Sequence, residues 1–423
     1  MRQFTFHTLP NGLRVLFVPR KESFTTTVMV SVTVGSKHET KEINGISHFL
    51  EHMCFKGTEK RPTSMHIASE LDGLGAQYNA FTSQESTSYY AKVKNEFLPQ
   101  ALDVISDIYL HPVFSPAEIE KEKGVIVEEI NMYEDMPSRR VQELFMELVY
   151  GDQPAGWGIA GRKDVVRGLQ QKDFIDYRSK HYIPASTVVA VSGGFDSKLA
   201  LKEIHRHFGA LAKKRQVSRA KVREKQLQPK ELISFKDSDQ THLVLGFRAF
   251  SFFDRRKYAL KVLADILGGG MSSRLFHKIR EELGAAYYVR ASDDLYSDHG
   301  IFEMSSGAQH AKVTEVISAM LQECGRLTKE LVSPSELRKV KDHLVGSMFL
   351  SLETSEDIAY FYAGQEIAGL PLSNPSEVGR RISLVTAEDV RAVARALFRD
   401  ARLNLAMIAP FKNKSFKDIL SVK

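Results

Sequence analysis

An internal duplication is the feature that most restricts how this chain can fold. Residues 27–36 (TVMVSVTVGS) correspond to residues 242–251 (HLVLGFRAFS), and residues 115–123 (SPAEIEKEK) correspond to residues 333–341 (SPSELRKVK). Two further blocks repeat in the same order, and all four pairs lie 215 to 218 positions apart. Because a repeated sequence unit folds the same way each time, the chain should contain two homologous domains.

The mixture of elements in each half predicts an α+β fold. Residues 4–18 have the pattern of a hairpin that turns at Asn11 and Gly12, and residues 76–93 have the pattern of two alternating strands. Strands and helices are intermixed without regular βαβ alternation. We therefore expect one mostly antiparallel sheet per domain, with helices packed on it.

A basic run at residues 213–225 (KKRQVSRAKVREK) separates the halves. Such a run could favour acidic partners, but it is more typical of a solvated linker, and a net charge of +6 is mild for 423 residues. No nucleic-acid partner is expected. The predicted organisation is an N-terminal domain at residues 1–212, a linker at 213–231 and a C-terminal domain at 232–423.

The composition predicts a cytoplasmic protein without a membrane association. No apolar run approaches the roughly 18 residues that a membrane span needs, and the first residues are polar where a signal peptide is apolar. The two cysteines, Cys54 and Cys324, are too few to form a disulfide framework. Both are expected to be buried thiols.

The segment HFLEH at residues 48–52 is a candidate metal site. On a helix, His48 and His52 project from one face, with Glu51 beside them. This spacing suits two imidazoles on one metal ion and a carboxylate next to a bound water, as in the inverted zincin motif HxxEH. A five-residue match could also be three polar groups on the solvated face of an ordinary helix.

The second half serves as a control for this motif. The equivalent positions there are apolar, namely Leu263, Ile266 and Leu267. The polar groups of the first half therefore occupy a face that is normally buried, where each would cost about 2 to 7 kcal/mol if left without a partner. A metal ion would remove that cost.

A third metal ligand is expected from the helix that begins near Pro116, because catalytic zinc usually takes three protein ligands and leaves one position for water. The predicted buried stripe of this helix consists of Val125, Ile126, Met132 and Tyr133. Glu129 falls inside the stripe and is the predicted ligand. Glu122 lies near it and is predicted to accept a hydrogen bond from a ligand histidine.

The chain resembles the inverzincin metallopeptidases of family M16, of the pitrilysin type, and especially the short bacterial members related to the mitochondrial processing peptidase. The motifs that carry the resemblance are NGLRV, HFLEH, GAQYNAFTSQESTSYY, EKEKGVIVEEINMYED and GGGMSSRLFHKIREELGAAYYV. They span nearly the whole chain. The resemblance implies that zinc binds to His48, His52 and Glu129, that Glu51 activates water, and that Glu122 supports the site. Manganese or cobalt would also suit these ligands.

The resemblance also implies how a substrate binds. Residues 79–82, which are Asn79, Ala80, Phe81 and Thr82, would form an edge strand on which an extended peptide lies as an added strand. Arg280 and Tyr287 match an arginine and a tyrosine that contact substrate near the scissile bond. Without the resemblance, Asn79 could be a turn residue, and Arg280 and Tyr287 ordinary surface residues.

For the whole chain, the resemblance implies a fold like that of the mitochondrial processing peptidase and LuxS, forming one bowl-shaped half of a clamshell. A homodimer is therefore expected, or a heterodimer with a related chain. The expected activity is zinc-dependent endopeptidase cleavage of peptides or of unfolded, presequence-like segments. The alternative is a non-catalytic scaffold subunit, since some relatives keep the fold without the chemistry.

Overall fold

A computed structural model describes residues 4–422 and divides the chain into two compact units. Unit 1 contains the described residues up to Ile130 together with Gly158–Ala220 and Leu350–Asn374. Unit 2 contains Asn131–Trp157, Lys221–Phe349 and Pro375 onwards. Each unit has one sheet with helices on it, so the predicted α+β class is confirmed.

The sheet of unit 1 has six strands in the order β1-β2-β6-β3-β5-β4. The strands are β1 (Thr5–Thr8), β2 (Arg14–Pro19), β3 (Thr25–Val32), β4 (Gln77–Thr82), β5 (Thr87–Lys94) and β6 (Thr187–Gly193). Only β2 and β6 pair in parallel; the other neighbours are antiparallel. Both predicted hairpins, β1–β2 and β4–β5, are present. Strand β4 lies at the edge of the sheet.

The sheet of unit 2 repeats this topology with five strands in the order β7-β11-β8-β10-β9. They are β7 (Lys230–Phe235), β8 (Thr241–Ala249), β9 (Ala286–Leu295), β10 (Gly300–Ala308) and β11 (Leu403–Ala409). The parallel pair is β7 with β11, which corresponds to β2 with β6 in unit 1. Strand β7 begins at Lys230, inside the segment 213–231 predicted as linker. The duplication seen in the sequence is thus a duplication of strand order.

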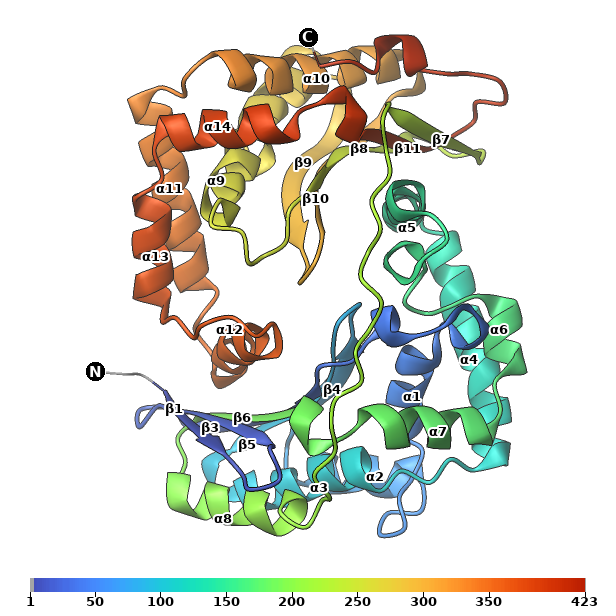
Figure 1. Ribbon diagram of the computed structural model, residues 1–423, viewed down its shortest axis with the longest axis vertical. Helices are drawn as coiled ribbons and strands as arrows, with labels where there is room; N and C mark the ends of the chain where they lie inside the picture. Colours follow the sequence, from blue (N-terminus) through green and yellow to red (C-terminus); the bar gives the residue numbers. More distant parts are fainter. Residues whose placement is uncertain (1–3, 423) are drawn as a thin grey trace. The chain divides into compact units, whose positions relative to one another are not determined.

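The sheet of unit 1 is covered by helices on both faces. Its helices are α1 (Ile46–Cys54), α2 (Ser64–Gly73), α3 (Leu98–Leu110), α4 (Pro116–Glu134, shared with unit 2), α6 (Lys163–Gly168), α7 (Gln171–His181), α8 (Ser197–Phe208) and α12 (Ser355–Ile367). Figure 1 shows α3 and α8 below the sheet and α12 above it. Along β3, Val28 and Val30 face the main core while Met29 faces the core that includes α12. This alternation is the period of two expected for a strand buried on both faces.

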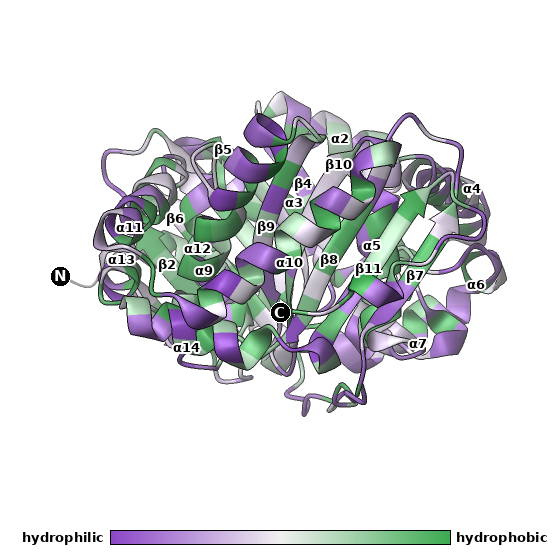
Figure 2. Ribbon diagram, turned by 90° about the horizontal axis from the view of Figure 1, so that it is seen from above, coloured by the Kyte–Doolittle hydropathy of each residue, from purple (hydrophilic) through white to green (hydrophobic). Residues whose placement is uncertain are grey.

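In unit 2, most helices pack against one face of the sheet. They are α9 (Lys257–Gly268), α10 (Val313–Lys329), α11 (Pro334–Leu350), α13 (Pro375–Ser383) and α14 (Ala387–Leu397), and α5 (Pro137–Tyr150) covers the opposite face. Figure 2 shows polar and apolar segments alternating along α14, as expected for a helix with one buried side. Cys54 and Cys324 are both buried, free thiols, as predicted.

Helices α5 and α12 each lie in the unit opposite to the sequence half that contains them. Helix α5 comes from the first half but packs on the unit 2 sheet through Val141 and Phe145. Helix α12 comes from the second half but packs on the unit 1 sheet through Ala359 and Tyr362. One face of each sheet is therefore covered by a helix whose sequence lies between two segments of the other unit. In the part of the chain that the structure describes, no helix is long and apolar enough to cross a membrane.

Candidate metal centre

Helix α1 presents the HFLEH segment because its apolar residues fix its orientation. Phe49, Leu50 and Met53 are fully buried, whereas His48 and His52 are only partly buried on another face of the helix. Apolar residues at these spacings hold the helix against the core while the two histidines, one turn apart, project together.

The start of α1 is fixed by groups outside the helix. Gly45 precedes it with φ +100°, and a Cβ there would come within 2.7 Å of the Ala160 carbonyl oxygen, so only glycine fits. The buried Glu39 carboxylate accepts hydrogen bonds from the backbone N–H of Gly45 at 2.7 Å and of Ser47 at 2.8 Å. These bonds satisfy donors at the helix N-terminus that have no partner within the helix. Burial raises the pKa of Glu39 to about 7, although these hydrogen bonds oppose the shift.

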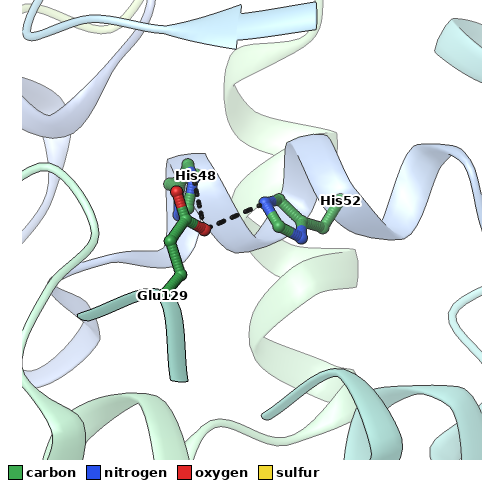
Figure 3. A group of neighbouring side chains, drawn as sticks. All are labelled: His48, His52 and Glu129. Carbon is green, nitrogen blue, oxygen red and sulfur yellow. Dashed lines mark ion pairs between the residues drawn. The ribbon is translucent and has the colours of Figure 1, made fainter. Parts of the chain in front are cut away.

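The structure brings His48, His52 and Glu129 together (Figure 3). One carboxylate oxygen of Glu129, Oε2, lies 3.6 Å from His48 Nε2 and 3.6 Å from His52 Nε2. In the described part of the chain, this is the one group of three or more His, Cys, Asp or Glu side chains close enough to hold a metal ion.

The spacing of these ligand atoms suits a tetrahedral metal ion. Bonds of about 2.0 to 2.2 Å to a tetrahedral zinc place two ligand atoms roughly 3.3 to 3.6 Å apart. The observed 3.6 Å is in that range, and it is longer than the usual 2.7 to 3.2 Å of a direct N–H···O hydrogen bond. The residues present therefore fit zinc, with Nε2 of each histidine and Oε2 of Glu129 as ligands.

Glu122 contacts one of the candidate ligand histidines, in the hydrogen bond that the sequence predicted. Its Oε1 lies 2.8 Å from His52 Nδ1, and its Oε2 lies 2.5 Å from Lys56 Nζ. A proton assigned to Nδ1 from this contact leaves Nε2 with a lone pair facing Glu129 and the metal position.

Charge interactions keep the Glu122 carboxylate ionised. Burial alone would raise its pKa, but the hydrogen bonds from His52 and Lys56 lower it overall. Burial likewise acts to lower the pKa of His52, and the Glu122 hydrogen bond, with Glu51 and Glu129 nearby, raises it overall. Glu122 and His52 thus each favour the charged form of the other.

Glu51 lies beside the ligand group and is only 8% exposed. Its Oε2 accepts a hydrogen bond of 2.5 Å from the Thr82 hydroxyl, at the end of β4. Burial raises the pKa of Glu51, while the Thr82 hydrogen bond acts in the opposite direction. The sequence placed Thr82 in the edge strand but gave no sign of this contact, since 31 residues separate the two side chains.

The predicted buried stripe of α4 is wrong in part. Val125 and Met132 are 51% and 49% exposed, whereas the buried residues are Ile119, Glu122, Lys123, Ile126, Val127 and Ile130. These follow the helical i, i+3, i+4, i+7 pattern from Ile119, and Val125 and Met132 lie outside it. Glu129 is half-buried at the margin of the true stripe and still reaches the ligand group.

The predicted edge strand at residues 79–82 is present as part of β4. It pairs only with β5, so its other backbone edge has no strand partner in the sheet. Asn79 is exposed, and its side-chain oxygen accepts a hydrogen bond from the Ala80 N–H. The Phe81 ring packs against Tyr360 of α12, with centroids 5.3 Å apart.

Arg280 and Tyr287 lie together in unit 2. Arg280 is in a π-helical segment, Phe276–Glu282, and its guanidinium carbon lies 5.4 Å from the centre of the Tyr287 ring. Tyr287 is in β9 and is 74% exposed. The pair is accessible, and its role toward a substrate stays a prediction.

At the positions equivalent to the polar residues of HFLEH, the second half has apolar side chains. Leu263, Ile266 and Leu267 on α9 are buried among apolar residues. Val340 on α11, at the position equivalent to Glu122, is also in that core. The two candidate histidine ligands of unit 1 thus have apolar counterparts at these positions of unit 2.

Fold and site together have the features of an inverzincin: an HxxEH helix beside a sheet and a distant glutamate that completes the ligand group. The family described as insulinase, peptidase family M16, matches residues 14–163, and the family described as peptidase M16 inactive domain matches residues 168–344. The chain belongs to peptidase family M16.

Individual relatives agree with this assignment. The chain is 34% identical over 407 residues to a Bacillus subtilis protein named "Uncharacterized zinc protease YmxG", covering 96% of this chain and 98% of the relative. Among solved structures, a protease from Helicobacter pylori has a TM-score of 0.89 at 23% identity, covering 96% of this chain and 99% of that one. A chain of complex III from Candida albicans has a TM-score of 0.85 at 18% identity, covering 98% of each. Both structural matches concern the fold.

Proposed function

We propose that this chain is a zinc-dependent endopeptidase that hydrolyses extended peptides lying along β4. The observation that carries the proposal is the 3.6 Å spacing of Glu129 Oε2 from Nε2 of both His48 and His52. The zinc-protease name of the relative from Bacillus subtilis supports it. One zinc ion per chain is proposed, because the described residues contain one such ligand group.

Bound zinc would supply a lowered water pKa and polarisation of the peptide carbonyl. Glu51 takes a proton from the attacking water and later delivers it to the leaving amine. Its position one residue before His52 places the carboxylate beside the ligand group. Glu122 holds His52 in the tautomer whose Nε2 can bind metal.

The free edge of β4 would bind the substrate. An edge strand offers backbone N–H and C=O groups to any extended chain, so recognition depends little on side-chain sequence. Asn79, Ala80 and Phe81 would contribute to this edge. We expect peptides and unfolded or presequence-like segments to be substrates, because a folded protein cannot add a strand.

Arg280 and Tyr287 are assigned to the oxyanion that forms when water attacks the carbonyl. A guanidinium and a phenol are both hydrogen-bond donors suited to a developing negative charge. The assignment rests on the family resemblance, and their mutual contact and the exposure of Tyr287 are compatible with it.

The test of the proposed function is Glu51→Gln in the zinc-loaded protein. We expect normal zinc content and a loss of peptide cleavage of about 10²- to 10⁴-fold, because the amide cannot accept the proton. The measurements are metal analysis and cleavage of a quenched fluorescent peptide with and without chelator. Cleavage by the variant at the wild-type rate would remove Glu51 as the base.

A homodimer in the cytoplasm is the proposed working form, with a heterodimer of related chains as the alternative. The support is the family resemblance, in which the substrate is enclosed between two bowl-shaped halves. Size-exclusion chromatography with light scattering should show a dimer. A fully active monomer would contradict the proposal.

A second candidate function is that of a non-catalytic scaffold subunit. The match to a chain of complex III supports it at the level of fold. The complete ligand group in unit 1 favours catalysis instead. Zinc-free protein that cleaves no peptide even after zinc is added would favour the scaffold.

A further inference from the structure

The hydroxyl of Thr82 forms a link between the edge strand and the candidate base. Thr82 is the last residue of β4, and its Oγ1 lies 2.5 Å from Glu51 Oε2 on α1. A short O–H···O⁻ contact of this kind is a charge-assisted hydrogen bond, which is stronger than one between neutral groups.

The surrounding network assigns the Thr82 proton to Glu51. Thr82 Oγ1 also lies 3.3 Å from Thr87 Oγ1, but a hydroxyl has only one proton, and the carboxylate oxygen is the nearer acceptor. The Thr87 hydroxyl is directed to the Val34 carbonyl oxygen at 3.1 Å. Thr82 therefore acts as a donor to Glu51, and Thr87 anchors the neighbouring strand.

We infer that Thr82 is a positioning residue that fixes the carboxylate plane of Glu51 for proton transfer. The terminal torsion of a glutamate has a broad energy minimum, so an unheld carboxylate samples many orientations. With Oε2 held by the Thr82 hydroxyl, Oε1 is left to receive the proton of the attacking water. This inference rests on the proposed function.

The Thr82–Glu51 hydrogen bond also connects the proposed substrate-binding strand β4 to the candidate base. Thr82 pairs with Thr87 of β5 through the backbone, so its position is set by the sheet. A peptide added to the free edge of β4 would rest on the same strand that orients the base. The alignment of substrate and base would then come from one rigid element, as efficient proton transfer requires.

The experiment compares Thr82→Val, which keeps the shape and removes the hydroxyl, with Thr82→Ser, which keeps the hydroxyl. In the zinc-loaded full chain, we expect Thr82→Val to lower kcat about 10- to 100-fold with little change in KM. Thr82→Ser should keep most of the wild-type kcat. Zinc affinity, measured by chelator competition, should be the same in all three proteins.

Thr87→Val is the matched control, because it removes the adjacent hydroxyl of the same network. It should lower the Tm without the loss of kcat. A wild-type kcat in Thr82→Val, an equal kcat loss in Thr87→Val, or a loss of zinc in Thr82→Val would each overturn the inference. If Glu51→Gln is inactive and Thr82→Val is not, the role of Thr82 fails while the proposed function stands; an inactive wild type overturns both.

Discussion

At the scale of single residues, the candidate metal centre contains carboxylates that contact its other side chains. Glu122 is buried, yet both of its oxygens have cationic or polar partners, His52 and Lys56. A buried carboxylate that lost these partners would carry a large desolvation cost. A role beside a ligand histidine would account for an acid at this position, where the second half has Val340.

Glu122→Gln tests this role. The amide keeps the shape and one acceptor for His52 Nδ1–H, but the negative charge is lost, so zinc affinity should fall about 10- to 100-fold. Chelator competition measures the affinity. The control is Glu128→Gln on the exposed side of the same helix, which should bind zinc as the wild type does. Equal affinity in Glu122→Gln would show that the carboxylate has no such role.

At the scale of elements, α5 and α12 each pack on the sheet formed by the other half of the sequence. Tyr362 of α12 is 2% exposed and packs with Leu16 and Met29 from the unit 1 sheet. Without α12, one face of this sheet would expose its apolar side chains, a known cause of aggregation. The two units are therefore interdependent for folding.

A fragment of residues 1–220 tests that interdependence. It contains all six strands of unit 1 but lacks α12, so we expect it to aggregate or to unfold without cooperativity. Fusing residues 350–374 to it through a flexible linker should restore a cooperative transition, followed by circular dichroism in urea. The same fusion carrying Tyr362→Asp is the control and should fail. A monomeric 1–220 fragment with a sharp transition would contradict this account.

At the scale of the whole molecule, stability should depend on pH through buried groups. Burial lowers the pKa of both His38 and His181 to about 4, with contributions from Arg219 for His38 and from Lys180 for His181. The unfolded chain, with ordinary histidine values near 6.5, binds more protons between pH 6.5 and 4. Stability from these two groups is present above pH 6.5 and is lost as the pH falls.

Glu39 acts in the opposite direction. Its folded pKa of about 7 lies above the ordinary value, so the folded chain keeps a proton that the unfolded chain releases, and its contribution falls as the pH rises toward 7. Burial also raises the pKa of Glu303 to about 7, so this carboxyl acts in the same direction as Glu39. Two carboxyls therefore oppose the two histidines between pH 6.5 and 5, and the contribution of one histidine is isolated by substituting it.

His181→Phe should make the chain about 2 kcal/mol less sensitive to acidification from pH 7 to pH 5 than the wild type is, because one proton-binding difference is removed. The measurement is urea unfolding at pH 7 and pH 5 in excess chelator, which keeps metal binding out of the comparison. His205→Gln, at an exposed position, is the control and should behave as the wild type does. An unchanged pH dependence in His181→Phe would exclude His181 as a source.

The sequence by itself determined the duplicated fold and most of the ligand group. Repeats reveal a shared topology, and spacing along one helix decides which side chains share a face, as for His48 and His52. The α4 stripe shows the limit of such reasoning: the sequence pattern places both Val125 and Ile126 in the buried stripe, but only Ile126 is buried.

Only the tertiary structure decided the contacts between distant elements. The Thr82 bond to Glu51 and the exchange of α5 and α12 each join segments with no shared periodicity. Such contacts depend on how whole elements pack, which is a global property of the chain, whereas spacing is a local one.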